Sequence, residues 1–379
     1  MRAVVVSSGG WGPDGPRVAG GVADAWRRAA CDVSVDVLPL ADGRAGTAEA
    51  LAAASDVVVL TDATLVDPAV PRAAAVTQGS SRALGALLAS ALRTDARTVL
   101  IALGDARTSS LAWADGGAGL LVGLAEGLGV PVPDAGRLTA GGPALRGVTA
   151  ADLPDLGALR RALAGRDVRV AHRSPDALLG LAGLAGSLVP DVLDAAASQE
   201  LERALGDLVH ALAGARAGSI VGRDLLGAAS LPSSGARAVA DDARALGAVR
   251  GGAAGGGVAA ALCALGVPLV PAAPVVADLV GAGARVAAAD LVVVVVPVLD
   301  GDEAHDGVLP VVAEAALDAA IPVVVLAGTS LSGRREWSAL GVAAVHETGW
   351  HVPDDLLGAD GLSAAAAERV ARVARTWRL

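Results

Sequence analysis

The chain has 379 residues, more than one hydrophobic core usually supports, so its length predicts two domains or one domain with a large insertion. Hydrophobic residues make up 53% of the chain and charged residues only 18%, which excludes an intrinsically disordered protein. The net charge of −10, without any stripe of basic residues, argues against nucleic acid and other polyanions as partners.

The sequence gives little sign of a membrane-spanning or export segment. The uncharged stretch 251–277 is long enough to cross a bilayer, but prolines interrupt it and much of the rest is glycine and alanine. We interpret it as a glycine-rich turn followed by a closely packed helix. The apolar run at 3–6 is too short for an export signal. Cys31 and Cys263 lie too far apart for a zinc or redox motif, so we expect reduced thiols in a cytoplasmic protein.

Strands alternate with helices in the first part of the chain. Short apolar runs predict the strands, and helical spacing of apolar residues predicts the helices between them. In chain order we predict a strand at 3–6, a helix at 17–30, a strand at 33–38, a helix from Thr47 and a strand at 57–60. Alternation of this kind indicates parallel pairing through right-handed crossovers.

The pattern changes in the middle of the chain and returns near its end. The middle is predicted to hold a long helix at 80–92, strands at 99–103 and 168–171, glycine-rich loops and further helices. The last third has strand-like runs at 291–296, 323–327 and 342–346, and the first is typical of a strand covered by helices on both faces. We therefore predict an open parallel sheet formed by residues 1–71 and 288–379, with an α/β domain at 72–287 inserted.

The loops after the strands are where an open α/β sheet binds its ligand. Several of these loops contain glycine, most often beside an aspartate: Asp42-Gly43, 115–117, 251–257 and Asp300-Gly301. The N–H groups of such loops can bind phosphate oxygens, although glycine can also serve only to permit a tight turn. The aspartates can hold Mg²⁺ or accept the proton of a substrate hydroxyl, and they can equally cap a helix. The residues alone leave these alternatives open.

Several common catalytic motifs are absent. The chain contains no lysine, which excludes a Walker-type phosphate loop, and it has no G-x-S-x-G elbow. No G-x-G-x-x-G segment follows the first strand, so a dinucleotide site is unsupported. His346 and His351 are one residue too far apart for the zinc-protease helix motif. We expect the histidines at the surface or in packing roles.

Residues 39–51 carry the most specific pattern in the sequence. They run P-L-A-D-G-R-A-G-T-A-E-A-L and resemble the segment P-M-A-D-G-G-E-G-T-x-E-A-L of the glycerate kinase family, the two-domain type found in bacteria. Other segments resemble that family's loops in the same order along nearly the whole chain: 115–119, 252–256, 289–301 and 323–328. The resemblance implies a flavodoxin-like domain formed by both chain ends, with a second α/β domain inserted. It also implies transfer of a phosphoryl group from ATP to glycerate with Mg²⁺.

The resemblance further implies which residues form the site. Asp42 and Asp300 would lie near the glycerate hydroxyl as the catalytic residues, and Asp115 or Asp176 would hold Mg²⁺. ATP and the small-molecule substrate would be bound by Gly43, Thr47, Ser80, Gly116, Gly117, Arg173, Gly255, Gly256 and Gly301.

Other positions depart from the family. Residues 6–12 lack the aspartate and the lysine of the family's A-P-D-S-F-K-G loop, and Arg173 and Pro175 replace acidic residues of its A-C-D-V-D-N-P-L-L-G segment. Val296 and Val298 replace the glutamate and the arginine of its G-E-G-R-I-D-G-Q segment. Loss of preorganised charges slows phosphoryl transfer by orders of magnitude, so a second hypothesis stays open. The chain would then be a catalytically silent homologue that binds a ligand or a partner.

Overall fold

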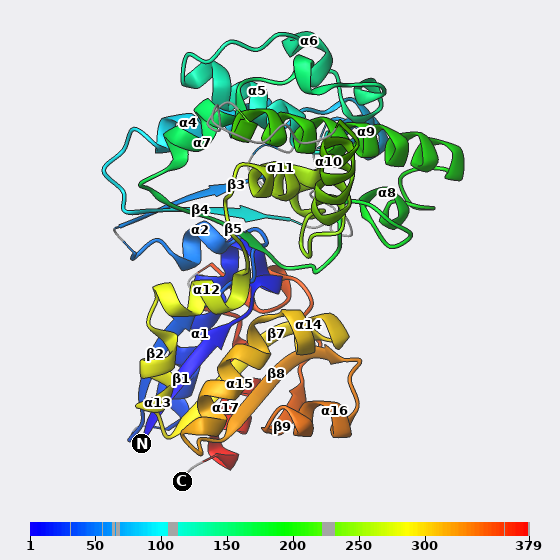
Figure 1. Cartoon of the computed structure of the whole chain (residues 1–379). Coiled ribbons are helices and arrows are strands. Elements are labelled where there is room, and N and C mark those ends of the chain that lie inside the picture. Colours follow the sequence, from blue (N-terminus) through cyan, green and yellow to red (C-terminus); the bar gives the residue numbers. More distant parts are fainter. Residues whose placement is uncertain are drawn as a thin grey trace. The chain divides into compact units, whose positions relative to one another are not determined.

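The computed structural model describes most of the chain. The described residues are 1–30, 32–54, 56–62, 65, 69–104, 113–221, 232–359 and 361–377. They form two compact units, which Figure 1 shows in sequence colours. We call Met1–Ser55 together with Pro271–Leu379 the terminal unit, and Asp56–Val270 the central unit.

A five-stranded parallel sheet forms the middle of the terminal unit. Its strands are β1 Arg2–Ser7, β2 Ser34–Pro39, β7 Leu291–Leu299, β8 Val323–Ser330 and β9 Val342–Glu347. They lie in the order β2-β1-β7-β8-β9, which is the strand order of flavodoxin-like sheets. The predicted fold class is therefore confirmed, because strands from both chain ends pair in one sheet with β1 between β2 and β7.

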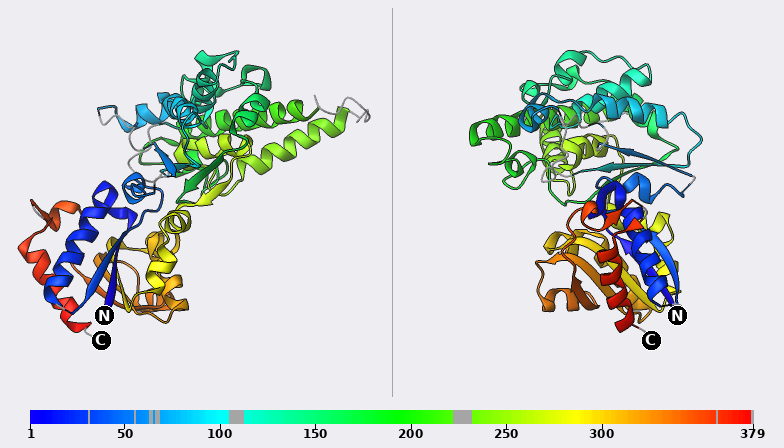
Figure 2. Two further views of the ribbon diagram at one scale, coloured as in Figure 1. Left: turned by 90° about the vertical axis from the view of Figure 1, so that its left-hand side faces the viewer. Right: turned by 180° about the vertical axis from the view of Figure 1, so that it is seen from behind.

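Helices cover both faces of this sheet. Figure 2 shows α1 and α17 together on one side of it, with α12, α13 and α15 on the other. Val18, Trp26 and Val370 of the first pair are fully buried in the core beneath them. The helices are η1 Gly9–Asp14, α1 Gly15–Ala29, α2 Thr47–Ala50, α12 Ala272–Leu279, α13 Ala282–Ala287, α14 Gly301–Asp306, α15 Val308–Asp318, α16 Arg334–Ala339, η6 Pro353–Asp355 and α17 Ala364–Thr376, and a small hairpin joins β10 Leu357–Gly358 to β11 Gly361–Leu362. Two helix layers explain why the valines of β7 are buried along most of the strand.

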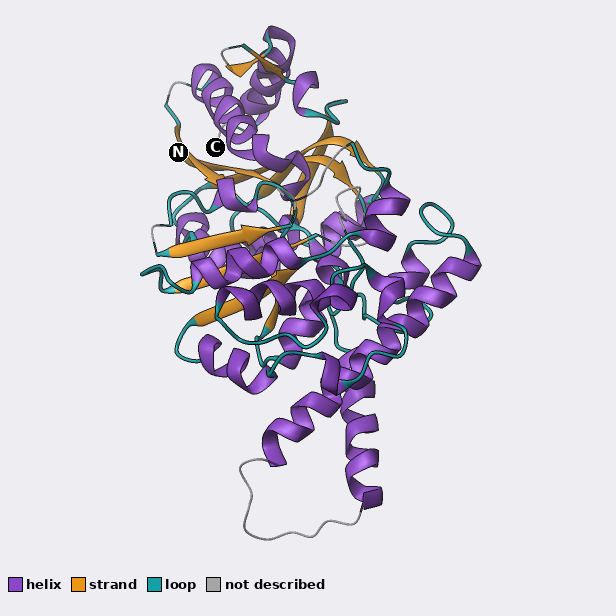
Figure 3. Cartoon of the chain, turned by 90° about the horizontal axis from the view of Figure 1, so that it is seen from above, coloured by secondary structure: helices purple, strands orange, loops and turns teal. Residues whose placement is uncertain are grey.

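The central unit has its own four-stranded sheet, in the order β3-β4-β5-β6. Its strands are β3 Val57–Thr61, β4 Thr98–Leu103, β5 Asp167–His172 and β6 Leu269–Pro271, and β4 pairs in parallel with both β3 and β5. Its helices are α3 Arg72–Gln78, α4 Arg82–Ala91, α5 Ala118–Gly127, α6 Ala135–Leu138, η3 Gly142–Leu145, η4 Ala150–Asp152, α7 Leu156–Leu163, α8 Leu184–Ser187, α9 Ala195–Val221, α10 Pro232–Gly247, η5 Ala254–Gly257 and α11 Val258–Ala264. Figure 3 shows α9 and α10 lying side by side as a long helical pair.

Glycines set the close packing of α4 on α5 in the central unit. A Cβ atom at Gly85 would lie 2.1 Å from the carbonyl oxygen of Leu120, and one at Gly123 would lie 2.0 Å from that of Arg82. The two helix backbones can therefore touch, and Leu84, Leu88 and Leu121 are fully buried around the contact.

The two junctions between the units fall at different places from those predicted. We expected the inserted domain to be 72–287, with the strand at 57–60 in the first sheet. Instead β3 pairs with β4, from Val57 opposite Thr98 to Thr61 opposite Ala102, so it belongs to the central unit. The helices α12 and α13 pack against α15 and belong to the terminal unit.

The stretch 251–277 forms η5, α11, β6 and most of α12. Within the described part of the chain, no helix combines the length and apolar character needed to cross a membrane. Cys263 is a free, partly buried thiol on α11, and Cys31 lies outside the described residues.

Candidate functional site

The terminal unit has a topological switch point between β1 and β7, because the chain continues from β1 to β2 on one side and from β7 to β8 on the other. Ligands of such sheets bind beyond the carboxyl ends of the strands at this point. Glycines let the loop after β1 approach the neighbouring loops. A Cβ at Gly9 would lie 2.1 Å from Oδ1 of Asp42, and one at Gly10 would lie 2.6 Å from the ring of Pro297. Asp42, which follows β2, is therefore held beside the switch point.

Asp42 is completely buried and is paired with an arginine two residues further on. Nε of Arg44 donates to Oδ1 of Asp42 at 3.0 Å, and Nη2 donates to Oδ2 at 2.6 Å. The same Nη2 also donates to Oε2 of Glu303 at 3.5 Å, and Glu303 is only 3% exposed. One guanidinium therefore lies between two buried carboxylates, which is an effective way to satisfy charge in a site of low solvent access. We call these three residues the Arg44 cluster.

Backbone geometry around the cluster explains the glycines of the Asp42 segment. Gly43 and Gly46 have φ angles of 93° and 101°, which residues other than glycine rarely adopt. The hydroxyl of Thr47 donates to the carbonyl oxygen of Arg44 at 2.7 Å and closes the turn. The predicted ligand residues Gly43 and Thr47 therefore shape the loop that carries Arg44.

Asp300 caps a helix at the same edge of the sheet. Its Oδ1 accepts the N–H of Glu303 at 2.8 Å, at the start of α14, and Gly301 is the first residue of that helix. Glu303 in turn accepts the N–H groups of Val308 and Leu309 through Oε1, at 3.1 and 3.4 Å. Asp300 thus positions Glu303, whose other carboxylate oxygen faces Arg44. The structure brings the two predicted catalytic residues into one connected set, and Glu303 is a member that the sequence did not indicate.

In the central unit, Asp115 is completely buried at the start of α5. Its Oδ1 accepts the N–H of Gly117 at 3.0 Å, and its Oδ2 accepts the N–H groups of Ser81 at 2.7 Å and Gly119 at 3.1 Å. The Ser81 hydroxyl contacts both oxygens at 2.9 Å and accepts the N–H of Leu120. Burial raises the pKa of Asp115, while its hydrogen-bond donors act in the opposite direction. The Asp115 carboxyl therefore links Ser81 to the amide groups that begin α5.

The other glycine loop of the central unit packs against this one. The N–H of Gly116 donates to the carbonyl oxygen of Gly256 at 3.0 Å, and the N–H of Gly255 donates to that of Gly104 at 2.8 Å. The indole of Trp113 donates to the carbonyl oxygen of Gly255 at 2.8 Å. A Cβ at Gly256 would lie 2.0 Å from the carbonyl oxygen of Trp113. These predicted ATP-binding glycines therefore have packing roles, and their binding of ATP stays a prediction.

The loop after β5 joins the same cluster. The carbonyl oxygen of Asp176 accepts the N–H of Ala253, and its own N–H donates to the Ser174 hydroxyl, both at 3.1 Å. Ser80 also lies here, because a Cβ at Gly119 would be 2.1 Å from its hydroxyl oxygen. Arg173 is partly exposed on this loop. Backbone hydrogen bonds therefore connect the loop of Asp115 to that of Gly256, and the latter to the loop of Asp176. Ser81 is a partner of Asp115 that the sequence did not indicate.

Asp115 does not fit the role of an Mg²⁺ ligand. Both of its oxygens already accept hydrogen bonds from the protein, and no part of it is exposed. Over the ranges that the structure describes, no group of three or more His, Cys, Asp or Glu residues is placed to hold a metal ion. Asp176 stays the predicted Mg²⁺ ligand of this unit.

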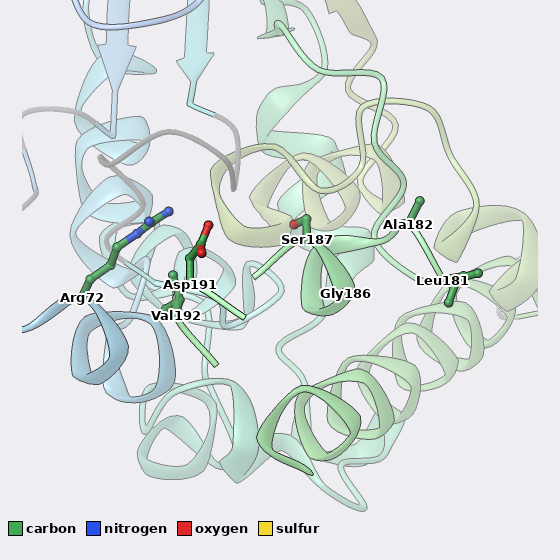
Figure 4. Close-up of a pocket in the computed structure, with 7 residues that line it drawn as sticks. All are labelled: Arg72, Leu181, Ala182, Gly186, Ser187, Asp191 and Val192. Atoms are coloured by element: carbon green, nitrogen blue, oxygen red, sulfur yellow. The ribbon is translucent and has the colours of Figure 1, made fainter. Parts of the chain in front are cut away.

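The central unit also contains a pocket that the sequence did not indicate, with a volume of about 390 Å³. Figure 4 shows Arg72 and Asp191 at one end of it and Leu181, which is fully exposed, at the other. The remaining lining residues are Ala182, Gly186, Ser187 and Val192. None of the predicted site residues lines this pocket.

Comparison with known proteins gives a matching family and solved structures of similar fold. The model of the "Glycerate kinase family" matches residues 68–377. Among solved structures, the crystal structure of a protein from Salmonella typhimurium LT2, provisionally named glycerate kinase 2, is similar with a TM-score of 0.71 and 23% sequence identity. The likeness covers 99% of this chain and 98% of that one, and at this identity it shows the fold. A search of curated proteins found no match.

Proposed function

The chain belongs to the glycerate kinase family, and on that premise we propose that it transfers a phosphoryl group from ATP to glycerate or a similar small hydroxy acid. The observation that carries this proposal is the position of Asp42. It is retained in the most specific segment of the sequence, and it lies beside the switch point of a flavodoxin-like sheet. Asp42 is buried and both of its oxygens accept from Arg44, so a substrate hydroxyl bound at that edge reaches the carboxylate once the Arg44 side chain turns aside.

In the proposed reaction, Asp42 accepts the proton of the substrate hydroxyl as that oxygen forms a bond to the γ-phosphorus of ATP. The bond from this phosphorus to the bridging oxygen breaks, and ADP leaves. Before the substrate binds, Arg44 holds the Asp42 carboxylate in place through two hydrogen bonds. Asp300 supports the arrangement through Glu303. Positioning of this kind accounts for most of the catalysis that phosphoryl transfer needs.

A second candidate function is that of a catalytically silent homologue that binds a ligand or a partner. It is supported by the way in which the chain satisfies its own charged groups. Asp42 is paired with Arg44, and Asp115 accepts hydrogen bonds from its own loop and from Ser81. The absence of lysine and the valines at 296 and 298 point in the same direction.

The test is a coupled ATP-consumption assay with D-glycerate and Mg²⁺, on the wild type and on Asp42→Asn. Loss of the base is expected to lower kcat by about 10²- to 10⁴-fold. Asp278→Asn is the matched control, because Asp278 is exposed on α12 and has no predicted site role; its kcat should equal that of the wild type. If the folded wild type shows no turnover above background, the silent homologue is the better description.

Asp300→Asn separates catalysis from helix capping in the same assay. Asparagine caps helices as well as aspartate does, so this variant should keep the hydrogen bond to Glu303 and an unchanged Tm. The predicted role of Asp300 near the glycerate hydroxyl needs the negative charge, so on that role we expect kcat to fall by at least about tenfold. Full activity in Asp300→Asn would restrict Asp300 to its capping role.

A further inference from the structure

Arg44 occupies both oxygens of the Asp42 carboxylate. Its Nε and Nη2 donate to Oδ1 and Oδ2 at 3.0 and 2.6 Å. The side chain of Asp42 is 0% exposed, whereas that of Arg44 is 26% exposed. A ligand that approaches from solvent therefore meets the guanidinium before it meets the carboxylate, and a hydroxyl that donates to Asp42 competes with Arg44 for the same oxygens.

The backbone of Arg44 is anchored, so that its side chain can change partners while the loop stays in place. The hydroxyl and the N–H of Thr47 both donate to the carbonyl oxygen of Arg44, at 2.7 and 3.2 Å. A Cβ at Gly46 would lie 2.2 Å from the carbonyl oxygen of Gly12, so the loop is also closely packed. A long side chain on a fixed backbone position reaches a different partner by changing its rotamer.

Glu303 offers the guanidinium a second carboxylate near Asp42. Its Oε2 accepts from Nη2 of Arg44 at 3.5 Å, a longer contact than the 2.6 Å between Nη2 and Asp42. Its Oε1 is held by the N–H groups of Val308 and Leu309, so Glu303 stays in place when Arg44 turns. Asp42, Arg44 and Glu303 have other interactions as well, and an exchange of partners at Arg44 does not require that any of them be absent.

A small hydroxy acid carries both groups that such an exchange needs. Its carboxylate can replace that of Asp42 as the bidentate partner of the guanidinium. Its hydroxyl can then donate to Asp42, so that the buried carboxylate receives a new hydrogen bond for those it loses. A neutral polyol brings only the hydroxyl and would break the ion pair without replacing it. Because a ligand shifts a conformational equilibrium only through its differential affinity for the two states, the acid favours the exchange and the polyol does not.

We propose that Arg44 is a specificity-determining residue, which covers Asp42 in the free protein and uncovers it by binding the carboxylate of the incoming hydroxy acid. This inference rests on the proposed phosphoryl transfer. It adds a reason for the preference for an acid over a neutral polyol, because the substrate hydroxyl reaches Asp42 only when a carboxylate has drawn Arg44 away.

The experiment compares D-glycerate with glycerol, which has a hydroxymethyl group in place of the carboxylate, as substrates of the wild type and of Arg44→Ala. We expect Arg44→Ala to lower kcat/KM for D-glycerate by at least about 100-fold, because the partner of the substrate carboxylate is lost. Turnover of glycerol should rise, since Asp42 is no longer covered. An equal fall with both substrates would overturn the proposal, because Arg44 would then serve only to position Asp42.

Titration calorimetry of D-glycerate in the absence of ATP separates this inference from the proposed function. We expect the Kd of Arg44→Ala to exceed that of the wild type by at least about 100-fold. An unchanged Kd would overturn the role of Arg44, whether or not the wild type turns over. If the wild type binds D-glycerate through Arg44 and shows no turnover, the proposed phosphoryl transfer fails and the role of Arg44 in binding stands.

Arg44→Lys covers the case in which Arg44→Ala folds poorly. Lysine keeps a cation beside Asp42, so its Tm should be close to that of the wild type, but an ammonium group cannot bind a carboxylate in the forked geometry of arginine. We expect kcat/KM for D-glycerate to fall by at least about tenfold and its Kd to rise by a similar factor. Wild-type values of both quantities in Arg44→Lys would overturn the proposal.

Arg146→Ala is the matched control for the loss of an arginine. Arg146 pairs with Asp207 at 2.6 Å in the central unit, is exposed, and has no predicted site role. Its kcat/KM for D-glycerate and its Kd should equal those of the wild type. Losses in Arg146→Ala as large as those in Arg44→Ala would also overturn the proposal, because they would not depend on the position of Arg44 beside Asp42.

Discussion

Asp42 and Asp115 are both fully buried aspartates, and the protein satisfies them by different means. Asp42 faces the guanidinium of Arg44, whereas Asp115 accepts N–H groups and a hydroxyl. A buried carboxylate without such partners would be costly, so each partner set is part of the fold as well as of a candidate site. The two aspartates should therefore respond differently to the loss of their charge.

Asp115→Asn should strongly destabilise the central unit. Each carboxylate oxygen accepts at least one backbone N–H. In either orientation of an asparagine side chain, its NH₂ group would therefore face a backbone N–H donor in place of an acceptor. We expect a loss of about 2–3 kcal/mol in the free energy of unfolding, measured by urea denaturation. Asp134→Asn is the matched control: Asp134 caps α6, where asparagine serves equally well, and the change should be below about 0.5 kcal/mol. Similar stabilities for the two variants would contradict this role of Asp115.

The sequence located these aspartates but not their partners. It placed Asp42, Asp115 and Asp300 in loops after strands, because a strand ends where its apolar run ends. It did not indicate Glu303 or Ser81, since contacts between loops depend on how distant segments pack. It also included Arg44 in a motif without showing that its guanidinium returns to Asp42.

At the scale of elements, a bidentate ion pair ties the edge strand β2 to the helix α13. Nε of Arg285 donates to Oδ2 of Asp36 at 2.9 Å, and Nη2 donates to Oδ1 at 2.7 Å. The same Nη2 donates to the carbonyl oxygen of Val37 at 2.7 Å. This contact, chiefly its hydrogen bond, lowers the pKa of Asp36 from 3.8. A helix from the second part of the chain thereby fixes a strand from the first.

The ion pair predicts a pH-dependent contribution to stability. Because the pKa of Asp36 is lower in the folded state, its contribution is present above 3.8 and is lost as the pH falls through the folded-state value. Arg285→Gln should therefore reduce the free energy of unfolding by about 1 kcal/mol at neutral pH, and the difference from the wild type should shrink in acid. Arg17→Gln, which removes an exposed pair with Asp14 on α1, should have little effect at either pH. A difference for Arg285→Gln that does not change with pH would show that packing, rather than charge, is lost.

Element positions were more predictable than element partners. The apolar runs at 291–296, 323–327 and 342–346 became β7, β8 and β9, because buried β-branched residues favour strands wherever they pair. The run at 57–60 was also a strand, β3, but it joined the other sheet. Periodicity identifies a buried strand and carries no information about which distant strand it will pair with. The helix predicted from Thr47 is a single turn, α2, which ends at Ala50.

At the scale of the whole molecule, the two units depend on chain connectivity in different ways. The central unit is continuous, and its core joins α4, α5, α9 and α11 around its own sheet. The terminal unit is discontinuous, and β1 from the first segment lies between β2 and β7. Removing residues 1–55 would take β1, β2 and α1 out of that unit, which would leave β7 as an unpaired edge rich in valine.

The central unit is therefore expected to fold alone, and the second segment of the terminal unit is not. A fragment of residues 56–270 should show a helical circular dichroism spectrum and a cooperative thermal transition, because its sheet and core are complete. A fragment of residues 271–379 should aggregate or remain unfolded, since the edge of β7 would expose unpaired backbone groups and valine side chains. Co-expression of the 271–379 fragment with residues 1–55 supplies β1 and β2 again and should restore a soluble, folded complex. A folded, monomeric 271–379 fragment would show that β1 is not needed to hold the sheet together, and that the predicted dependence of this unit on both chain ends is wrong.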